Sequence, residues 1–274
     1  AFDGNDLPGV MLASAAQAYA NRWAVRPGRR AVVFGANDTI YEVANDLAAA
    51  GVEIAALIDA RAAAAPGLAP PPGVPVLAGQ AVVRARGGLE LRGVDVAAPG
   101  GTGPVQHIAC DLLAVSGGWS PAVHLHSQSR GSLRWEDDIA AFVPDAPAQP
   151  SASAGAAAGQ FGLARALATG AGAAAAALGL ASPPAVPEAA DGAHAIAPLW
   201  SVPARRRGAK AFVDILNDVT VEDLALARRE GYGAAEHAKR YTTAGMALDQ
   251  GKAGGMTIMG VLAELGGTAP GTVG

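Results

Sequence analysis

The sequence contains a single cysteine, Cys110, among 274 residues. One thiol excludes an intrachain disulfide and every zinc or iron–sulfur site that needs several thiolates. No motif around Cys110 marks it as a nucleophile, so it is interpreted as a core residue. The sequence also lacks a basic-then-apolar N-terminal signal. Together these absences predict a cytoplasmic protein.

Positive charge and aromatic residues are also scarce. The net charge of −4 gives no basic footprint, so we expect neither nucleic acid nor an anionic membrane as a partner. The longest run of small apolar residues, 170–181, is too short and too rich in alanine and glycine to span a bilayer. Aromatics make up 5% of the chain and hydrophobic residues 51%, so the core must be built mainly from alanine, valine and leucine. The length predicts a large core in two or three lobes.

Residues 30–61 have the pattern of a strand–helix–strand unit. An apolar run at 31–34 is followed by a tight turn and a helical pattern at 39–50. A second apolar run, 52–58, ends in Asp59, about 20 positions after the turn, which is the layout of a dinucleotide-binding half. This unit predicts an α/β fold.

The turn of this unit departs from the G-x-G-x-x-G fingerprint. Its three positions are Gly35, Asn37 and Ile40. Asn37 carries a side chain into the space of a pyrophosphate, and Ile40 replaces the glycine that allows close helix–strand packing. We therefore expect that the unit keeps its fold but binds no dinucleotide.

The segments around this unit give further expectations. A helix is predicted at 11–24 with no strand before it. A further strand is predicted to start at 76–77, and a β-meander at 81–109 with a hairpin around Gly87-Gly88. A buried strand follows at 110–116. His124 and His126 are expected to share a face, but no third metal ligand is apparent, so ordinary polar contacts are favoured.

Residues 154–163 form a glycine-bearing entry into a long helix that is predicted to reach about residue 177. Free N–H groups at a helix start suit a phosphate, and small side chains allow the backbone to approach a ligand. Close packing of an Ala/Gly helix against a sheet explains the same residues, and both readings stay open. Residues 181–203 are predicted to be an extended, proline-rich linker.

From residue 211 the sequence predicts a small all-α lobe. Thr220 and Asp223 have capping-box spacing at the start of a helix that ends at Gly231. Further helices are predicted at 234–243 and 256–265.

Several motifs of the chain resemble the α subunit of heterotetrameric sarcosine oxidase. They are NDVTVEDL at 217–224, EHAKRYTTAGM at 236–246, DQGK at 249–252, PGVMLA at 8–13, AVSGGWSPAVHL at 114–125 and SQSRG at 127–131. The resemblance implies a central segment of a longer subunit, with a dinucleotide half before Ala1 and a folate-binding domain after Gly274. In that family the α subunit binds NAD, a β subunit carries FAD, FMN lies at the α/β interface, and γ and δ subunits complete the complex. Sarcosine, a small amine, is converted to glycine and hydrogen peroxide, and a one-carbon unit passes to tetrahydrofolate.

The resemblance also implies a domain layout. Residues 1–26 and 127–200 would belong to a first, NAD-binding domain, residues 27–126 to a second, inserted dinucleotide-type domain with a β-meander, and residues 205–274 to the helical lobe. No residue of this chain is expected to be catalytic. The expected NAD contacts are Ala154, Gly155, Gly159, Gln160, Phe161 and Gly162.

The helical lobe is similar to a [2Fe–2S]-binding lobe of opine and amino-acid dehydrogenase subunits. The positions that match its four cysteines are Asp214, Leu216, Asp249 and Gly254, so no cluster is expected. Candidates for contact with another anion, such as a flavin phosphate, are Lys239, Arg240, Thr242, Thr243, Gln250 and Lys252. The alternative is that these side chains cap helices and form surface ion pairs. For the chain as a whole, the alternatives are a ligand-free scaffold subunit or a subunit of an opine or amino-acid dehydrogenase.

Overall fold

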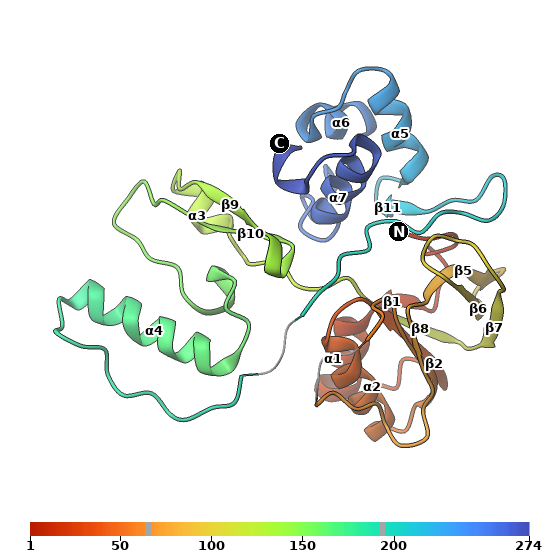
Figure 1. Cartoon of the computed structure of the whole chain (residues 1–274), viewed down its shortest axis with the longest axis horizontal. Coiled ribbons are helices and arrows are strands. Elements are labelled where there is room, and N and C mark those ends of the chain that lie inside the picture. Colours follow the sequence, from red (N-terminus) through yellow and green to blue (C-terminus); the bar gives the residue numbers. More distant parts are fainter. Residues whose placement is uncertain (64–66, 192–194, 274) are drawn as a thin grey trace. The chain divides into compact units, whose positions relative to one another are not determined.

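The structure of the chain is a computed structural model that describes residues 1–63, 67–191 and 195–273. It divides into two compact units, one formed by Ala1–Gly118 with Ala197–Gly274 and the other by Trp119–Ile196. Figure 1 shows the chain in sequence colours.

A five-stranded parallel sheet with the order β1-β8-β2-β3-β4 organises the first unit. The helices α1 and α2 lie beside this sheet and contact each other (Figure 1). The elements are β1 (Val10–Leu12), α1 (Ala13–Trp23), β2 (Arg30–Gly35), α2 (Thr39–Ala49), β3 (Glu53–Asp59), β4 (Val76–Ala78) and β8 (Leu112–Ser116). The predicted strand–helix–strand unit and the α/β class are therefore confirmed.

The start of this unit differs from the prediction. The helix begins at Ala13, and the three residues before it form β1, which pairs in parallel with Leu113–Val115 of β8. The prediction of no opening strand was wrong. Pairing with a strand about a hundred residues away decides the conformation of such a short apolar segment, and local pattern does not reveal it.

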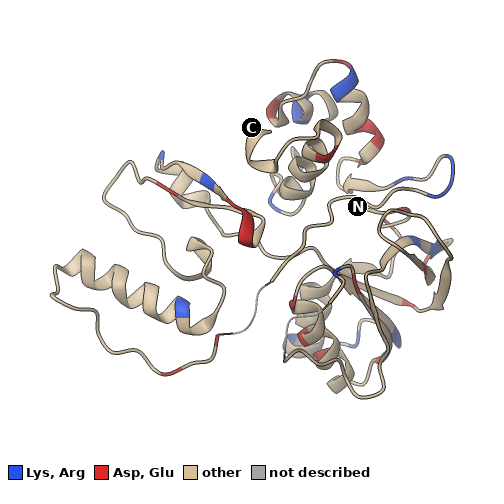
Figure 2. Cartoon of the chain, viewed as in Figure 1, with Lys and Arg blue, Asp and Glu red and all other residues tan. Residues whose placement is uncertain are grey.

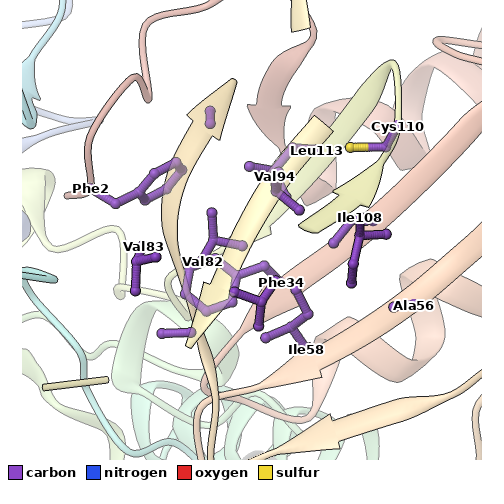
Figure 3. Close-up of a cluster of buried hydrophobic side chains, with 14 of the residues drawn as sticks. Phe2, Phe34, Ala56, Ile58, Val82, Val83, Val94, Ile108, Cys110 and Leu113 are labelled. Atoms are coloured by element: carbon purple, nitrogen blue, oxygen red, sulfur yellow. The ribbon is translucent and has the colours of Figure 1, made fainter. Parts of the chain in front are cut away.

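The predicted β-meander is confirmed as a three-stranded antiparallel sheet. Its strands are β5 (Ala81–Gly87), β6 (Leu91–Ala97) and β7 (Gln106–Ala109). Buried side chains of the meander and of one sheet face share a core with Phe2 and Cys110 (Figure 3). A second core, with Ile40 and Leu47 of α2, covers the opposite sheet face. The result is three layers, and Cys110 is a core residue as predicted, 5% exposed.

The lobe at the C-terminal end of the first unit contains the three predicted helices. Its elements are β11 (Phe212–Asp214), β12 (Val219–Thr220), α5 (Val221–Arg229), α6 (Ala235–Thr242), α7 (Gly255–Gly266) and the 3₁₀ turn η3 (Pro270–Thr272). The capping box is present, because Thr220 Oγ1 accepts from Asp223 N and Asp223 Oδ2 from Thr220 N. The lobe is not purely helical as predicted, since β11 and β12 form an antiparallel pair.

The second unit has a different construction. It contains α3 (His124–Gln128), β9 (Leu133–Glu136), η1 (Asp137–Ile139), β10 (Ala141–Pro144), η2 (Gly155–Ala158) and α4 (Leu163–Leu178). The predicted long helix is present as α4 and follows the glycine-bearing entry, in which Gly159 at φ +80° ends the 3₁₀ turn η2. Arg165 is the one charged residue in the sequence of α4, and the rest of this helix is tan in Figure 2.

The predicted domain boundaries place residues 1–26 with residues 127–200, and the structure shows what the first of these segments contacts. The segment 1–26 packs on the strand–helix–strand unit through β1 and through contacts of α1 with α2. Its membership of one domain with residues 127–200 stays a prediction. In the described parts of the chain, no helix has the length and apolar character needed to cross a bilayer.

Candidate functional site

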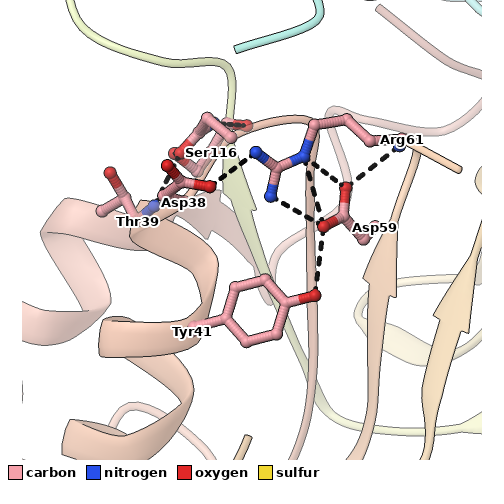
Figure 4. A network of polar contacts seen from close by, with 7 residues as sticks. Asp38, Thr39, Tyr41, Asp59, Arg61 and Ser116 are labelled. Atoms are coloured by element: carbon pink, nitrogen blue, oxygen red, sulfur yellow. Dashed lines mark hydrogen bonds and ion pairs between the residues drawn. The ribbon is translucent and has the colours of Figure 1, made fainter. Parts of the chain in front are cut away.

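The carboxyl ends of β2, β3 and β8 carry a buried polar network (Figure 4). Asp59, the last residue of β3, is fully buried, and its two oxygens accept hydrogen bonds from Arg61 Nε at 2.9 Å and Nη2 at 2.8 Å. Tyr41 Oη donates to the same carboxylate at 3.1 Å. Arg61 Nη1 donates to Asp38 Oδ1 at 2.6 Å, so a single guanidinium joins two carboxylates.

This environment shifts the ionisation of the tyrosine and the arginine. Burial, with the negative charge of Asp59 as the next cause, raises the pKa of Tyr41 to about 12. The hydrogen bond to Asp59 raises the pKa of Arg61 above its ordinary value. Both side chains therefore keep their protons at any physiological pH and remain hydrogen-bond donors to Asp59.

Asn37 occupies the second position of the degenerate fingerprint and turns its amide inward. Its Nδ2 donates to the carbonyl of Ser116 at 2.9 Å, and its Oδ1 accepts from Ser116 Oγ at 3.1 Å. The same Oδ1 accepts from Thr39 N at 3.1 Å, at the start of α2. An N–H group that would otherwise face a phosphate is bonded to the chain itself.

Gly35 is the one fingerprint glycine that remains, and the structure shows why. A Cβ at this position would lie 2.5 Å from the carbonyl oxygen of Ser116 and 2.6 Å from Cγ2 of Ile40. Ile40 fills the space between helix and strand that the third fingerprint glycine would leave open, and it is fully buried. Gly35 is therefore required here for the close packing of β2 against Ser116 and Ile40.

The six predicted NAD contacts, Ala154 to Gly162, lie on η2 and the turn that leads into α4. Gly155 has φ +59°, and an added Cβ would meet only Ala166, at 3.5 Å. At Gly159 a Cβ would lie 2.8 Å from Val143 Cγ1, so this glycine is needed for packing against β10. Gly155 therefore has open space beside its Cα, apart from the ordinary contact with Ala166.

The start of α4 carries an anion supplied by the chain. Asp191 Oδ1 accepts from Arg165 N at 3.1 Å, and Asp191 Oδ2 pairs with Arg165 Nε at 3.1 Å. The N-terminal end of α4 thus accepts a negative group, which is the property expected of a phosphate site. Sequence reasoning missed Asp191, since it lies in the proline-rich segment 26 residues after Arg165.

In the helical lobe, Asp214 and Asp249 hold loop segments together through hydrogen bonds to backbone N–H groups. Asp214 is buried and accepts from Leu216 N at 2.9 Å, Asn217 N at 3.1 Å and Gly245 N at 2.7 Å. Asp249 accepts from Gly251 N and Ala253 N. Hydrogen bonds to these two carboxylates thus join chain segments of the lobe.

The six predicted anion contacts of the lobe are placed around two adjacent turns. Gly245 and Gly251 touch, because a Cβ on either would lie 3.3–3.4 Å from the Cα of the other, and Lys239 Cε approaches Gly245 as closely. Thr243 and Gln250 have left-handed backbone angles, φ +65° and +53°. Arg240, Thr243, Gln250 and Lys252 are exposed, whereas Lys239 and Thr242 are half-buried.

Some of these side chains make the contacts expected if they only cap helices and form surface ion pairs. Thr242 Oγ1 donates to Ala238 O, and Lys239 pairs with Glu236 at 3.3 Å. The two predicted histidines lie on α3, where His126 Nε2 contacts Ser132 O at 2.8 Å. Within the described ranges, no group of three or more His, Cys, Asp and Glu side chains could hold a metal ion.

Two proteins are similar to this chain over nearly its whole length. It is 42% identical over 280 residues to sarcosine oxidase subunit alpha of Rhizobium meliloti (strain 1021), covering 100% of this chain and 28% of that protein. It is 43% identical over 284 residues to the subunit alpha of Corynebacterium sp. (strain P-1), covering 96% and 29%. The chain therefore spans less than a third of the length of these relatives.

A family model matches part of the chain, and a solved structure shares its fold. Residues 208–274 match the model of the sarcosine oxidase A3 domain. L-proline dehydrogenase from P. horikoshii has the same fold, with a TM-score of 0.64 at 18% identity, over 100% of this chain and 52% of that one. Over its whole length the chain is thus similar to a stretch of sarcosine oxidase subunit alpha, and its residues 208–274 are similar to the sarcosine oxidase A3 domain.

Proposed function

We propose that this chain is the NAD-binding and flavin-facing portion of the α subunit of a sarcosine-oxidase-like complex. The complex would convert sarcosine oxidatively to glycine and hydrogen peroxide and pass a one-carbon unit to tetrahydrofolate. The observation that carries the proposal is the 42% identity to a sarcosine oxidase subunit alpha along the whole chain. The partners would be β, γ and δ subunits, and the complex would be cytoplasmic.

In this proposal the amine oxidation takes place outside the chain. FAD on the β subunit would supply the redox chemistry, FMN would lie at the α/β interface, and tetrahydrofolate would lie on a domain beyond residue 274. The residues of this chain would bind and orient cofactors. Purifying the full-length subunit with its partners and measuring hydrogen peroxide formed from sarcosine tests the whole proposal. Turnover of an opine or L-proline with none of sarcosine would favour the dehydrogenase alternative.

For NAD, the residues that fit best are those at η2 and at the start of α4. Asp191 occupies the start of α4 in this structure, so a pyrophosphate bound there would take the place of its carboxylate. Gly155 leaves its surface open apart from the ordinary contact with Ala166. Gln160 and Phe161 are half-buried in the same turn and are proposed to contact the nucleotide.

A substitution that respects the backbone tests this site. Asparagine tolerates positive φ better than most residues, so Gly155→Asn adds a side chain on the open surface with little strain. Gly179→Asn is the matched control, because Gly179 has φ +64° and nothing lies within 4 Å of an added Cβ. We expect Gly155→Asn to lower the NAD content of the full-length complex at least about tenfold and Gly179→Asn to leave it unchanged, a tenfold change corresponding to about 1.4 kcal/mol. Full NAD content in both variants would reject the site.

For a flavin phosphate, the two touching turns at Gly245 and Gly251 are the proposed location. They bring together two left-handed residues, Thr243 and Gln250, and place Lys239 beside them. Arg240 and Lys252 are exposed and would add positive charge. Residues in such backbone conformations often occur at ligand sites, which favours a binding role.

The flavin proposal is tested by charge removal. We expect Arg240→Gln and Lys252→Gln each to lower the FMN content of the purified complex, while Arg229→Gln, on α5, does not. Thermal unfolding should be nearly unchanged in all three, because these are exposed arginine and lysine side chains. Unaltered FMN content in the Arg240→Gln/Lys252→Gln double variant would leave these residues as surface groups.

A further inference from the structure

We propose that Asn37 and Arg61 form a built-in plug that occupies, from within the chain, the places where the phosphate and ribose of a dinucleotide would bind at the end of β2 and β3. This closed nucleotide cleft is separate from the NAD site proposed at residues 154–162, and the inference does not depend on that site.

The ribose side of the cleft is filled by Arg61. An acidic residue at the end of the second strand normally accepts hydrogen bonds from ribose hydroxyls. Here Asp59 stands at that place, but both of its oxygens already accept from the Arg61 guanidinium and one also from Tyr41. Asp59 is fully buried, and the side chain of Arg61 is 9% exposed. A ribose could reach Asp59 only after the guanidinium had left.

The phosphate side is filled by Asn37 and Asp38. Asn37 Oδ1 accepts from Thr39 N, so the side-chain oxygen stands where a phosphate oxygen would at the start of α2. Asp38 adds a negative charge at the same helix end, 3% exposed and paired with Arg61 at 2.6 Å. A pyrophosphate could reach the start of α2 only after the Asn37 side chain and this ion pair had moved away.

If the network only stabilised the fold, its removal would lower the stability of the protein without creating a nucleotide-binding site. The plug predicts that its removal opens a nucleotide site. The test is the triple variant Asn37→Gly/Asp38→Ala/Arg61→Ser in the full-length subunit. Asp38 and Arg61 are removed together, so the local charge is unchanged and Asp59 keeps the hydrogen bond from Tyr41.

The measurement is calorimetric titration with ADP-ribose, counting equivalents bound per subunit. We expect the triple variant to bind one more equivalent of ADP-ribose than the native subunit. The same difference is expected when both proteins carry Gly155→Asn, which is meant to disable the site proposed at residues 154–162. The matched control is Glu90→Ala/Arg92→Ser, which removes an exposed ion pair of the same unit and should add none. ADP-ribose with a 2′-phosphate should not bind at the opened cleft, because Asp59 would face the phosphate. A folded triple variant with no additional equivalent overturns the plug.

A second measurement on the native subunit does not depend on the variant's folding. Hydrogen exchange is followed with and without excess ADP-ribose. We expect the amides of residues 37–41 and 59–61 to exchange at the same rates in both samples. Ligand-induced protection of these amides would show that the cleft is open and would overturn the proposal.

Discussion

The indole ring of Trp200 lies directly against the backbone of Gly260 in α7, so closely that a Cβ at Gly260 would overlap the ring. Trp200 packs on the core of the helical lobe that Ile258 and Val261 also form. The contact fixes the segment after Ala197 to the lobe. It also explains why a glycine stands in the middle of a helix, because any side chain there would clash with the indole.

This contact predicts that Gly260→Ala destabilises the protein. Alanine normally favours a helix over glycine by about 1 kcal/mol. Here the added methyl group must displace the indole, and overpacking costs about 1–3 kcal/mol, so the sign reverses. Gly255→Ala, in the same helix with nothing within 4 Å, is the control and should stabilise by up to about 1 kcal/mol. Urea unfolding of the full chain measures both; equal effects would contradict the steric argument.

The parallel sheet and the meander could be predicted from the sequence because their signals are local. Buried parallel strands appear as continuous apolar runs, and Gly87-Gly88 marks the hairpin. The strand β1 could not be predicted in this way. Three residues carry no periodicity, and only pairing with Leu113–Val115 makes them a strand.

The site was predictable only in part. The lost fingerprint glycines were visible, and so was Asp59 at the strand end. The role of Arg61 was not, because an arginine two residues after a strand is usually a surface residue. An acid followed at two positions by arginine, together with an acid at the helix start, is the pattern that could have indicated it. Asp191 gave no such signal, since only the folded chain brings it to α4.

A second prediction concerns Asp214, whose carboxylate holds three backbone N–H groups. Asp214→Ala leaves the buried N–H of Gly245 without an acceptor, which costs about 1–3 kcal/mol, and the other two bonds add to this loss. We expect a drop of at least about 2 kcal/mol in the free energy of unfolding. Glu236→Ala breaks only the exposed pair with Lys239 and should cost no more than about 0.5 kcal/mol. Similar losses in the two variants would mean that Asp214 is not a structural tie.

A third prediction concerns the reactivity of Cys110. Burial, the largest cause, raises the pKa of its thiol to about 12, and the residue is 5% exposed. The thiolate is the reactive form, so the native protein at pH 8 should be almost inert to a disulfide reagent. In denaturant one thiol per chain should react at once. Rapid reaction of the folded protein would contradict the buried core position.

The last prediction is the pH dependence that Tyr41 brings to stability. Its hydroxyl donates to the buried carboxylate of Asp59, and a hydrogen bond to a charged group contributes about 1.5–3 kcal/mol. At pH 7 we therefore expect Tyr41→Phe to lower the free energy of unfolding by about that amount. Tyr232→Phe, on an exposed ring 40% accessible, should change it little.

The sign of the pH effect follows from the raised pKa. In the folded chain the pKa of Tyr41 is about 12, above the ordinary value of 10.0. The unfolded chain therefore loses the phenol proton first, and the stability contributed by Tyr41 is complete below pH 10 and is lost as pH rises toward 12. The difference between native protein and Tyr41→Phe in urea unfolding should be constant from pH 7 to about 9.5 and then shrink. A difference that stays constant or grows above pH 10 would show that the hydroxyl does not donate to Asp59.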